Sequence, residues 1–127
     1  MSLRSPLGKV IGRGSAKQGV SHWWGQRLSA VALAFLGLWF VLQVTGLNAY
    51  DYDSVRAWIG SGTTPVLLVQ FIAVLAWHSA LGVQVVLEDY VHVKAIKLAA
   101  LVASIFFHVF VAVAGSYAVL RIAFTTT

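Results

Sequence analysis

An apolar stretch decides the fold of this chain; it reads PVLLVQFIAVLAWHSALGVQVVL and covers residues 65–87. A helix of about 20 mostly apolar residues is long enough to cross the ~30 Å hydrocarbon core of a membrane. Two further runs, residues 28–47 and 98–124, meet the same criterion. The pattern predicts an all-α integral membrane protein with three transmembrane helices, preceded by a basic N-terminal arm over residues 1–20. Residues 21–127 then form one three-helix membrane domain.

The composition excludes several classes of protein. Of the 127 residues, 59% are hydrophobic and 10% are charged, and the mean hydropathy is +0.82. A soluble domain of this size needs more charge on its surface. The chain contains no cysteine, which excludes disulfides, iron–sulfur clusters and thiolate metal sites within it. It also contains no phosphate-binding glycine loop, nucleophile elbow or HExxH motif.

The basic residues predict the orientation in the membrane, because cytoplasmic segments carry an excess of Lys and Arg. Seven of the nine lie in the N-terminal segment or in the predicted second loop, residues 88–97, namely Arg4, Lys9, Arg13, Lys17, Arg27, Lys94 and Lys97. Only Arg56 and Arg121 lie at the other end of the predicted spans. We therefore expect a cytoplasmic N-terminus and an external C-terminus.

His78 is an ionisable residue within the second span, and such residues are costly in a membrane unless they have a function. It lies about ten residues, or roughly 15 Å, from the cytoplasmic end of its helix. Neutral imidazole is a good ligand for haem iron, and Gly82, one turn on, would let a flat macrocycle approach. The alternative is a histidine that hydrogen-bonds a neighbouring helix.

His108 lies at a similar depth in the third span and is a rival ligand. Two histidines on neighbouring antiparallel helices could hold one haem within this chain. However, three helices enclose a porphyrin poorly, and no tyrosine, acid or glycine pattern accompanies His108 on its own face toward the cytoplasm. We expect a packing or hydrogen-bonding role for His108.

Three further residues lie where the spans meet the cytoplasmic surface. Eleven residues make three helical turns plus roughly 20°, so Asp89 shares a helix face with His78. Tyr90 could donate a hydrogen bond to a quinone carbonyl, and Asp89 could orient groups or relay protons. Arg27 could pair with haem propionates or join a quinone-site network. The alternatives are that Tyr90 is an ordinary interfacial tyrosine, that Asp89 is merely solvated, and that Arg27 only sets the orientation in the membrane.

The segment from His78 through Gly82 to Asp89-Tyr90 resembles the H-x(3)-G-x(6)-D-Y motif of the small hydrophobic anchor subunit of succinate dehydrogenase. Two earlier segments, GSAK (residues 14–17) and HWWGQRLSA (residues 22–30), are similar to the bacterial form of that subunit. The resemblance covers nearly the whole chain. The Ser-Pro-His and His-Arg-Thr-Gly motifs of the partner cytochrome b subunit are missing.

The resemblance implies a role for each matching residue. His78 is the implied axial ligand of haem b, whose other ligand comes from the cytochrome b subunit. Tyr90 is the implied hydrogen-bond donor to ubiquinone, Asp89 supports it, and Arg27 lies near the quinone site and the haem propionates. The implied partners are that cytochrome b anchor subunit, the iron–sulfur subunit and the flavoprotein subunit.

The resulting hypothesis is a membrane anchor subunit of succinate:ubiquinone oxidoreductase (respiratory complex II) in the bacterial inner membrane. The complex links the tricarboxylic acid cycle to electron transport, and this chain alone is not catalytic. One alternative is a structural anchor without a cofactor. The other is a small b-type cytochrome subunit of a related fumarate reductase.

Overall fold

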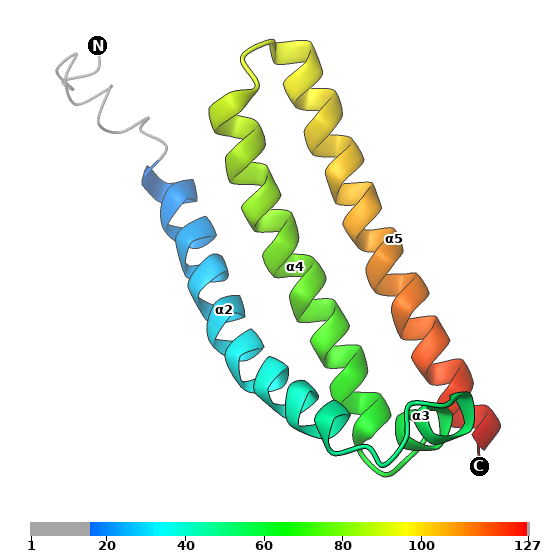
Figure 1. Ribbon diagram of the computed structural model, residues 1–127. Helices are drawn as coiled ribbons and strands as arrows, with labels where there is room; N and C mark the ends of the chain where they lie inside the picture. The colour runs from blue at the N-terminus through cyan, green and yellow to red at the C-terminus, as the bar shows by residue number, and fades with distance from the viewer. Residues whose placement is uncertain (1–15, 127) are drawn as a thin grey trace, which may run out of the picture.

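The computed structural model describes residues 16–126 and consists there of four helices (Figure 1). They are α2 (Ala16–Thr45), α3 (Tyr52–Ile59), α4 (Thr64–Tyr90) and α5 (Lys94–Thr126). Three of them, α2, α4 and α5, are long and apolar enough to cross a membrane. The predicted all-α fold with three apolar helices is thus confirmed.

The long helices extend beyond the predicted spans. The first begins at Ala16, twelve residues before residue 28, so the last five residues of the predicted arm are helical and residues 1–15 lie outside the described part. The predicted loop over residues 88–97 is corrected to residues 91–93, because α4 continues to Tyr90 and α5 starts at Lys94. Polarity marks where a helix leaves the hydrocarbon, whereas a helix ends only where its backbone pairing stops.

Residues 48–64, between the first two predicted spans, were expected to form a loop, but they contain the short helix α3. Asp51 caps this helix: its Oδ1 accepts a hydrogen bond from the Ser54 backbone N–H at 2.9 Å, and its Oδ2 accepts from the Ser54 hydroxyl at 2.9 Å. The backbone hydrogen bond from Ser54, followed by that from its hydroxyl, lowers the pKa of Asp51. Trp58 then faces Phe40 of α2 with a ring centroid distance of 6.1 Å.

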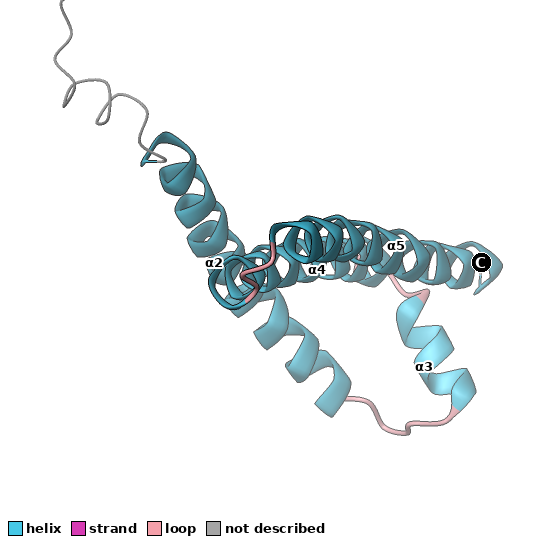
Figure 2. Ribbon diagram, turned by 90° about the horizontal axis from the view of Figure 1, so that it is seen from above, coloured by secondary structure: helices cyan, strands magenta, loops and turns pink. Residues whose placement is uncertain are grey.

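The long helices form a single layer with α4 in the middle. Among the described helices, α4 contacts both α2 and α5, whereas α2 and α5 do not touch. Seen from above, α4 and α5 lie in line and α2 crosses α4 (Figure 2). Glycines permit close approach on both flanks of α4. A Cβ at Gly25 would come within 3.3 Å of Leu81 Cδ1, and one at Gly115 within 3.3 Å of Ile72 Cγ2.

A single layer leaves almost every apolar side chain uncovered. Within the described residues, Leu68 and Val119 are the only buried apolar side chains. Large side chains such as Phe35 and Phe106 are each 72% exposed. Since apolar area of this extent must be removed from water, lipid or other helices must cover both faces of the layer. Any large cofactor that contacts this layer would therefore be enclosed partly by another chain.

Candidate functional site

The imidazole of His78 lies between α4 and α2, and both of its nitrogens have partners there. Nδ1 is 2.9 Å from the hydroxyl oxygen of Ser29, and Nε2 is 3.4 Å from the amide nitrogen of Gln26. Ser29 is only 1% exposed, which makes it the most buried side chain of the described residues. The histidine is thus held against the first transmembrane helix.

The hydrogen bonds around Ser29 favour one tautomer of His78. The Ser29 hydroxyl donates to the Gly25 carbonyl at 2.7 Å, or less closely to the Gln26 carbonyl at 3.1 Å. A hydroxyl has a single proton, so Ser29 Oγ accepts from His78 Nδ1–H. Nε2 then carries a lone pair, which receives a long contact from the Gln26 amide. An imidazole that is oriented through Nδ1–H and carries its lone pair on Nε2 has the form in which histidine binds a metal.

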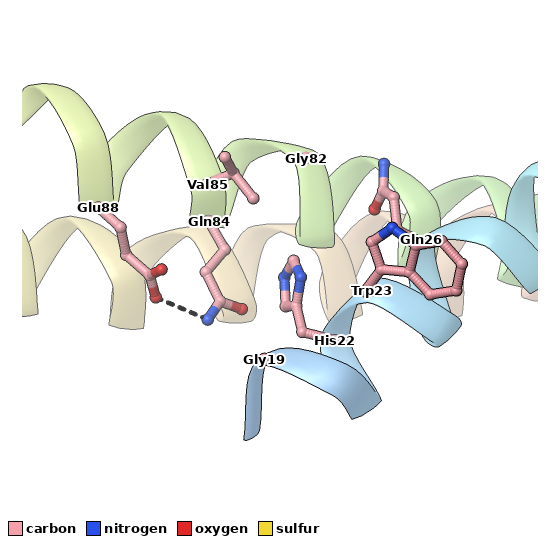
Figure 3. A pocket seen from close by; sticks show the side chains of 8 residues that line it. All are labelled: Gly19, His22, Trp23, Gln26, Gly82, Gln84, Val85 and Glu88. Carbon is pink, nitrogen blue, oxygen red and sulfur yellow. Dashed lines mark hydrogen bonds between the residues drawn. The ribbon is translucent and has the colours of Figure 1, made fainter. Parts of the chain in front are cut away.

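A cavity of about 830 Å³ lies beside this histidine, between the first half of α2 and the last three turns of α4. This size is within the range of cofactor and ligand sites. Figure 3 shows the side chain of His22 reaching from α2 toward α4, whereas the Glu88 carboxylate is hydrogen-bonded to the Gln84 amide on α4. A Cβ at Gly82 would meet only Gln26 Nε2, at 3.9 Å, so this part of α4 has a flat surface.

Two polar atoms of the cavity wall are buried and have no hydrogen-bond partner. They are Nε2 of His22 and Oε1 of Gln26. A buried polar group without a partner is costly, and such groups are expected where a ligand or another chain supplies the missing contact. The unpaired nitrogen, the lone pair of His78 behind Gln26 and the flat surface at Gly82 together fit a planar group with polar edges.

Ser29 was not predicted as a site residue, and the reason is the start of the first helix. With a span that begins at residue 28, Ser29 would lie at the membrane surface and His78 ten residues deeper. In the structure, Ser29 lies 13 residues after the helix start at Ala16, and His78 lies 12 residues before the helix end at Tyr90. Because α2 and α4 are antiparallel neighbours, the two residues are at the same level. The sequence signal for this site was the polar pair Gln26 and Ser29, which lie one turn apart on the same helix. It could not be used because the predicted span began at residue 28 and not at Ala16.

Asp89 and Tyr90 form the last turn of α4 and do not line the cavity. Both are exposed, Tyr90 by 77%. Two hydrogen bonds stabilise the end of this helix. Lys97 Nζ donates to the Glu88 carbonyl at 2.8 Å, and the Gln84 amide donates to the Glu88 carboxylate at 2.8 Å. Since α4 is continuous from Thr64 to Tyr90, Tyr90 lies ~18 Å along the helix axis from His78.

The structure does not bring Arg27 into the cavity. Its guanidinium lies over the ring of Trp23, 5.4 Å from the ring centroid, and its side chain is exposed. Such a cation–π contact orients the guanidinium at the helix surface. Arg27 is nevertheless next to Gln26 in the sequence and two residues before Ser29, so it belongs to the same end of α2.

His108 makes its contacts on a different side of α4 from His78. Its Nδ1 is 2.7 Å from the Ser104 carbonyl oxygen, and its Nε2 is 3.1 Å from the hydroxyl of Ser79. Nδ1–H therefore donates to Ser104, and Nε2 accepts from Ser79. This is the packing and hydrogen-bonding role expected from the sequence. Because His78 contacts α2 instead, the two histidines do not face a common site within this chain.

The described residues contain no group of three or more His, Asp or Glu side chains that could hold a metal ion. A haem does not require such a group, because a single histidine from each of two chains can supply its axial ligands.

Comparisons with known proteins agree with this geometry. The family model of the succinate dehydrogenase/fumarate reductase transmembrane subunit matches residues 1–118. A succinate dehydrogenase hydrophobic membrane anchor subunit from Rickettsia bellii is 33% identical over 120 residues, which are 92% of this chain and 94% of the relative. The subunit of the same name from Paracoccus denitrificans is 30% identical over 121 residues, or 95% and 93% of the two chains. No solved structure matches the chain at a significant level.

These matches extend across the apolar helices, the first half of α2 and the last turns of α4, which together form the site. The chain therefore belongs to the family of succinate dehydrogenase/fumarate reductase transmembrane subunits, and it resembles the hydrophobic membrane anchor subunits of succinate dehydrogenase.

Proposed function

We propose that this membrane anchor subunit supplies His78 as one axial ligand of a haem b and helps to form a ubiquinone site at the end of α4. The second ligand would come from a cytochrome b subunit with a similar three-helix layer. The observation that carries the proposal is the Ser29–His78 hydrogen bond of 2.9 Å, which leaves Nε2 of His78 with its lone pair. The cavity of about 830 Å³ beside it provides space for a flat group.

The residues of the cavity have distinct parts in this proposal. Among the described residues, the Gln26 amide is the hydrogen-bond partner of His78 Nε2, and at 3.4 Å this contact is long enough to be displaced by a ligand. His22, with its unpaired Nε2, is placed to donate to a polar edge of the bound group. The haem, when bound, supplies a one-electron carrier within the membrane. Its enclosure requires the partner, because the single layer of helices is open on both faces.

Ser29 offers a test of this arrangement. A hydrogen-bond acceptor for Nδ1–H makes the imidazole a stronger donor to iron and favours the ferric state. We expect Ser29→Ala to raise the midpoint potential of the haem by tens of millivolts. The figure follows from a hydrogen bond worth about 1 kcal/mol and from ~59 mV for each tenfold change in a one-electron equilibrium. A redox titration of the haem bands measures it; Ser29→Thr retains the hydroxyl and serves as the control. Equal potentials in the alanine variant and the wild type would contradict the hydrogen bond.

The quinone site is proposed at the exposed end of α4. Tyr90 would donate its hydroxyl proton in a hydrogen bond to a quinone carbonyl, and Asp89 would hold water or orient neighbouring groups there. Both side chains are exposed in this chain, as expected if the pocket is completed by other subunits. Arg27, at the same end of the layer, is proposed to bind anionic groups there, either propionates or the acids of a neighbouring subunit.

The charge distribution supports a cytoplasmic location of this end and of the soluble subunits. Lys94, Lys97 and Arg27 lie at this end of the helices, and the sequence before α2 carries further basic residues. In a bacterial cytoplasmic membrane, such residues remain on the inner side. The flavoprotein and iron–sulfur subunits would then oxidise succinate in the cytoplasm and dock on this surface.

Deletion of this chain tests the anchor function directly. We expect succinate oxidation by an artificial soluble acceptor to move from the membrane to the soluble fraction. Reduction of ubiquinone by succinate should fall to the background rate, because the catalytic subunits no longer reach the quinone. Both activities are measured in the two fractions, with the chain restored on a plasmid as the control. Succinate oxidation that stays with the membrane in the deletion strain would exclude the anchor function.

Two alternatives have support of their own. The family description includes fumarate reductases, so the complex could work in the opposite direction. The rates of succinate oxidation and fumarate reduction by the purified complex distinguish the two. Both nitrogens of His78 have partners within this chain, which is the arrangement of an anchor without haem. A purified complex without haem bands would favour that structural anchor.

A further inference from the structure

A second cavity lies at the opposite end of the layer, where α3 meets the end of α5 (Figure 1). Its volume is about 490 Å³, and its wall contains two arginines, two tyrosines and a threonine: Tyr52, Arg56, Tyr117, Arg121 and Thr125. No part of the proposed haem or quinone site involves it. It contains the only two basic residues that the chain has at this end of its helices.

The polar side chains come from two matching helix faces. Tyr52 and Arg56 are one turn apart on α3, and Tyr117, Arg121 and Thr125 follow one another at intervals of four residues on α5. The two faces are joined where Arg56 Nη2 donates to the Thr125 carbonyl at 3.1 Å. This bond also satisfies a carbonyl at the negative end of α5, which would otherwise disfavour an anion.

Both arginines have capacity for an anion. Among the residues that the structure describes, neither guanidinium forms an ion pair with an acidic side chain. Asp51 and Asp53 belong to the same region, but neither lines the cavity, and Asp51 is bonded to Ser54. A guanidinium has five N–H donors, and Arg56 directs only its Nη2 group at Thr125. Two guanidinium groups beside one cavity can donate to the oxygens of a phosphate group.

The cavity also lies at an end of the helices that could cross a membrane, where lipid headgroups are expected. The membrane-crossing helices begin or end here, at Thr64 and Thr125. Tyr117 lies ~12 Å along α5 from Thr125, toward the hydrocarbon. Apolar side chains flank the cavity on α5, with Phe124 79% exposed and Val113 64% exposed. A ligand with a phosphate group and an apolar tail would match both features, because the phosphate would bind the arginines and the tail would cover the apolar side chains of α5.

We propose that this cavity binds an anionic phospholipid, with its phosphodiester at Arg56 and Arg121 and its acyl chains along α5. The lipid would fill the space between the short helix and the end of α5. It would thereby add to the contacts that hold α3, such as Trp58 against Phe40 and Arg56 against Thr125. Tyr52 belongs to α3, outside the membrane-crossing helices, so its hydroxyl would lie near the headgroups, where tyrosine is enriched in membrane proteins.

The test uses the intact complex purified in mild detergent and reconstituted with equal amounts of phosphatidylglycerol and phosphatidylcholine. Retained lipid is measured by native mass spectrometry. Arg121→Gln is the informative variant, since Arg56 also holds Thr125 and its loss would disturb the fold. We expect Arg121→Gln to lower retained phosphatidylglycerol by about tenfold, the factor expected for one charge-assisted hydrogen bond. Arg121→Lys should retain most of it.

Lys94→Gln is the matched control, because it removes one positive charge at the other end of α5. It should leave lipid retention unchanged. The proposal is overturned if Arg121→Gln has no effect, if Lys94→Gln has the same effect, or if phosphatidylcholine is retained as well as phosphatidylglycerol. Displacement of the lipid by millimolar inorganic phosphate would identify a free-phosphate site and also overturn it. The same holds if the wild-type complex retains no lipid because another subunit covers the cavity.

Discussion

Replacing His78 with alanine is expected to lower the haem content of the complex by more than about tenfold. The reason is that Nε2 of His78 is the proposed ligand, and even the partners of a metal ligand are worth 10–100-fold in affinity. The reduced-minus-oxidised spectrum of the purified complex measures the loss, together with the flavin content as a measure of assembled enzyme. Any haem that remains should show a changed midpoint potential, because it would lack one of its two axial nitrogens.

His108→Ala is the matched control for this experiment. Both histidines lie within apolar helices, but His108 is hydrogen-bonded to Ser104 and Ser79 on another side of α4. Its replacement should leave the haem spectrum and potential unchanged. An unaltered b-type spectrum in the His78→Ala complex would reject axial ligation by His78. Loss of haem in both variants, at normal flavin content, would instead favour a haem held within this chain.

Replacing Tyr90 with phenylalanine is expected to slow ubiquinone reduction by about tenfold or more. The substitution removes the hydroxyl that we propose to bind the quinone carbonyl, and a hydrogen bond of about 1.5 kcal/mol corresponds to about a tenfold rate. Succinate oxidation by a soluble artificial acceptor should remain unchanged, because it bypasses the quinone. The ratio of the two rates in one preparation is the measurement.

Tyr50→Phe provides the control for Tyr90, since Tyr50 is another exposed tyrosine, at the opposite end of the layer. It should leave both rates unchanged. If Tyr90→Phe retains the wild-type quinone kinetics, Tyr90 does not belong to the site. If both acceptor reactions slow together, the substitution acts on assembly and not on the quinone.

The three long helices could be predicted from hydropathy, because each apolar run is long enough to span a membrane. Their ends could not. Residues 16–27 contain charged and polar side chains, yet they continue α2, since helix formation tolerates such residues where no proline or glycine pair interrupts it. The short helix α3 was missed because eight residues of mixed polarity carry no spanning signal. Its local signal was the capping pair of Asp51 and Ser54.

The candidate site was predictable only in part. His78 stands out because an ionisable residue inside a span is rare, and its phase relative to Asp89 follows from helix geometry. The contact of His78 with Ser29 depends on how far α2 is shifted along α4. That offset is set by the true start of α2 and by the close packing of Gly25 against Leu81. Neither is visible in a hydropathy pattern, so the partner of Nδ1 could not be assigned from the sequence.

The single layer of helices explains why this chain needs lipid or partner helices around it to be stable. With Leu68 and Val119 as the only buried apolar side chains in residues 16–126, the stability of the assembled protein must come from lipid and partner helices. A second layer of helices from a partner subunit would complete the wall of the cavity beside His78. A haem shared between two such layers would also join them, which couples cofactor binding to assembly.

The most direct test of the proposed function is the composition of the complex that co-purifies with this chain. The chain, carrying an affinity tag, is isolated from membranes in mild detergent, and flavin, iron–sulfur signals and haem b are quantified in the product. We expect all three to co-purify with the chain, together with succinate-dependent reduction of ubiquinone. Isolation of the chain without flavin and without haem would contradict the proposed function.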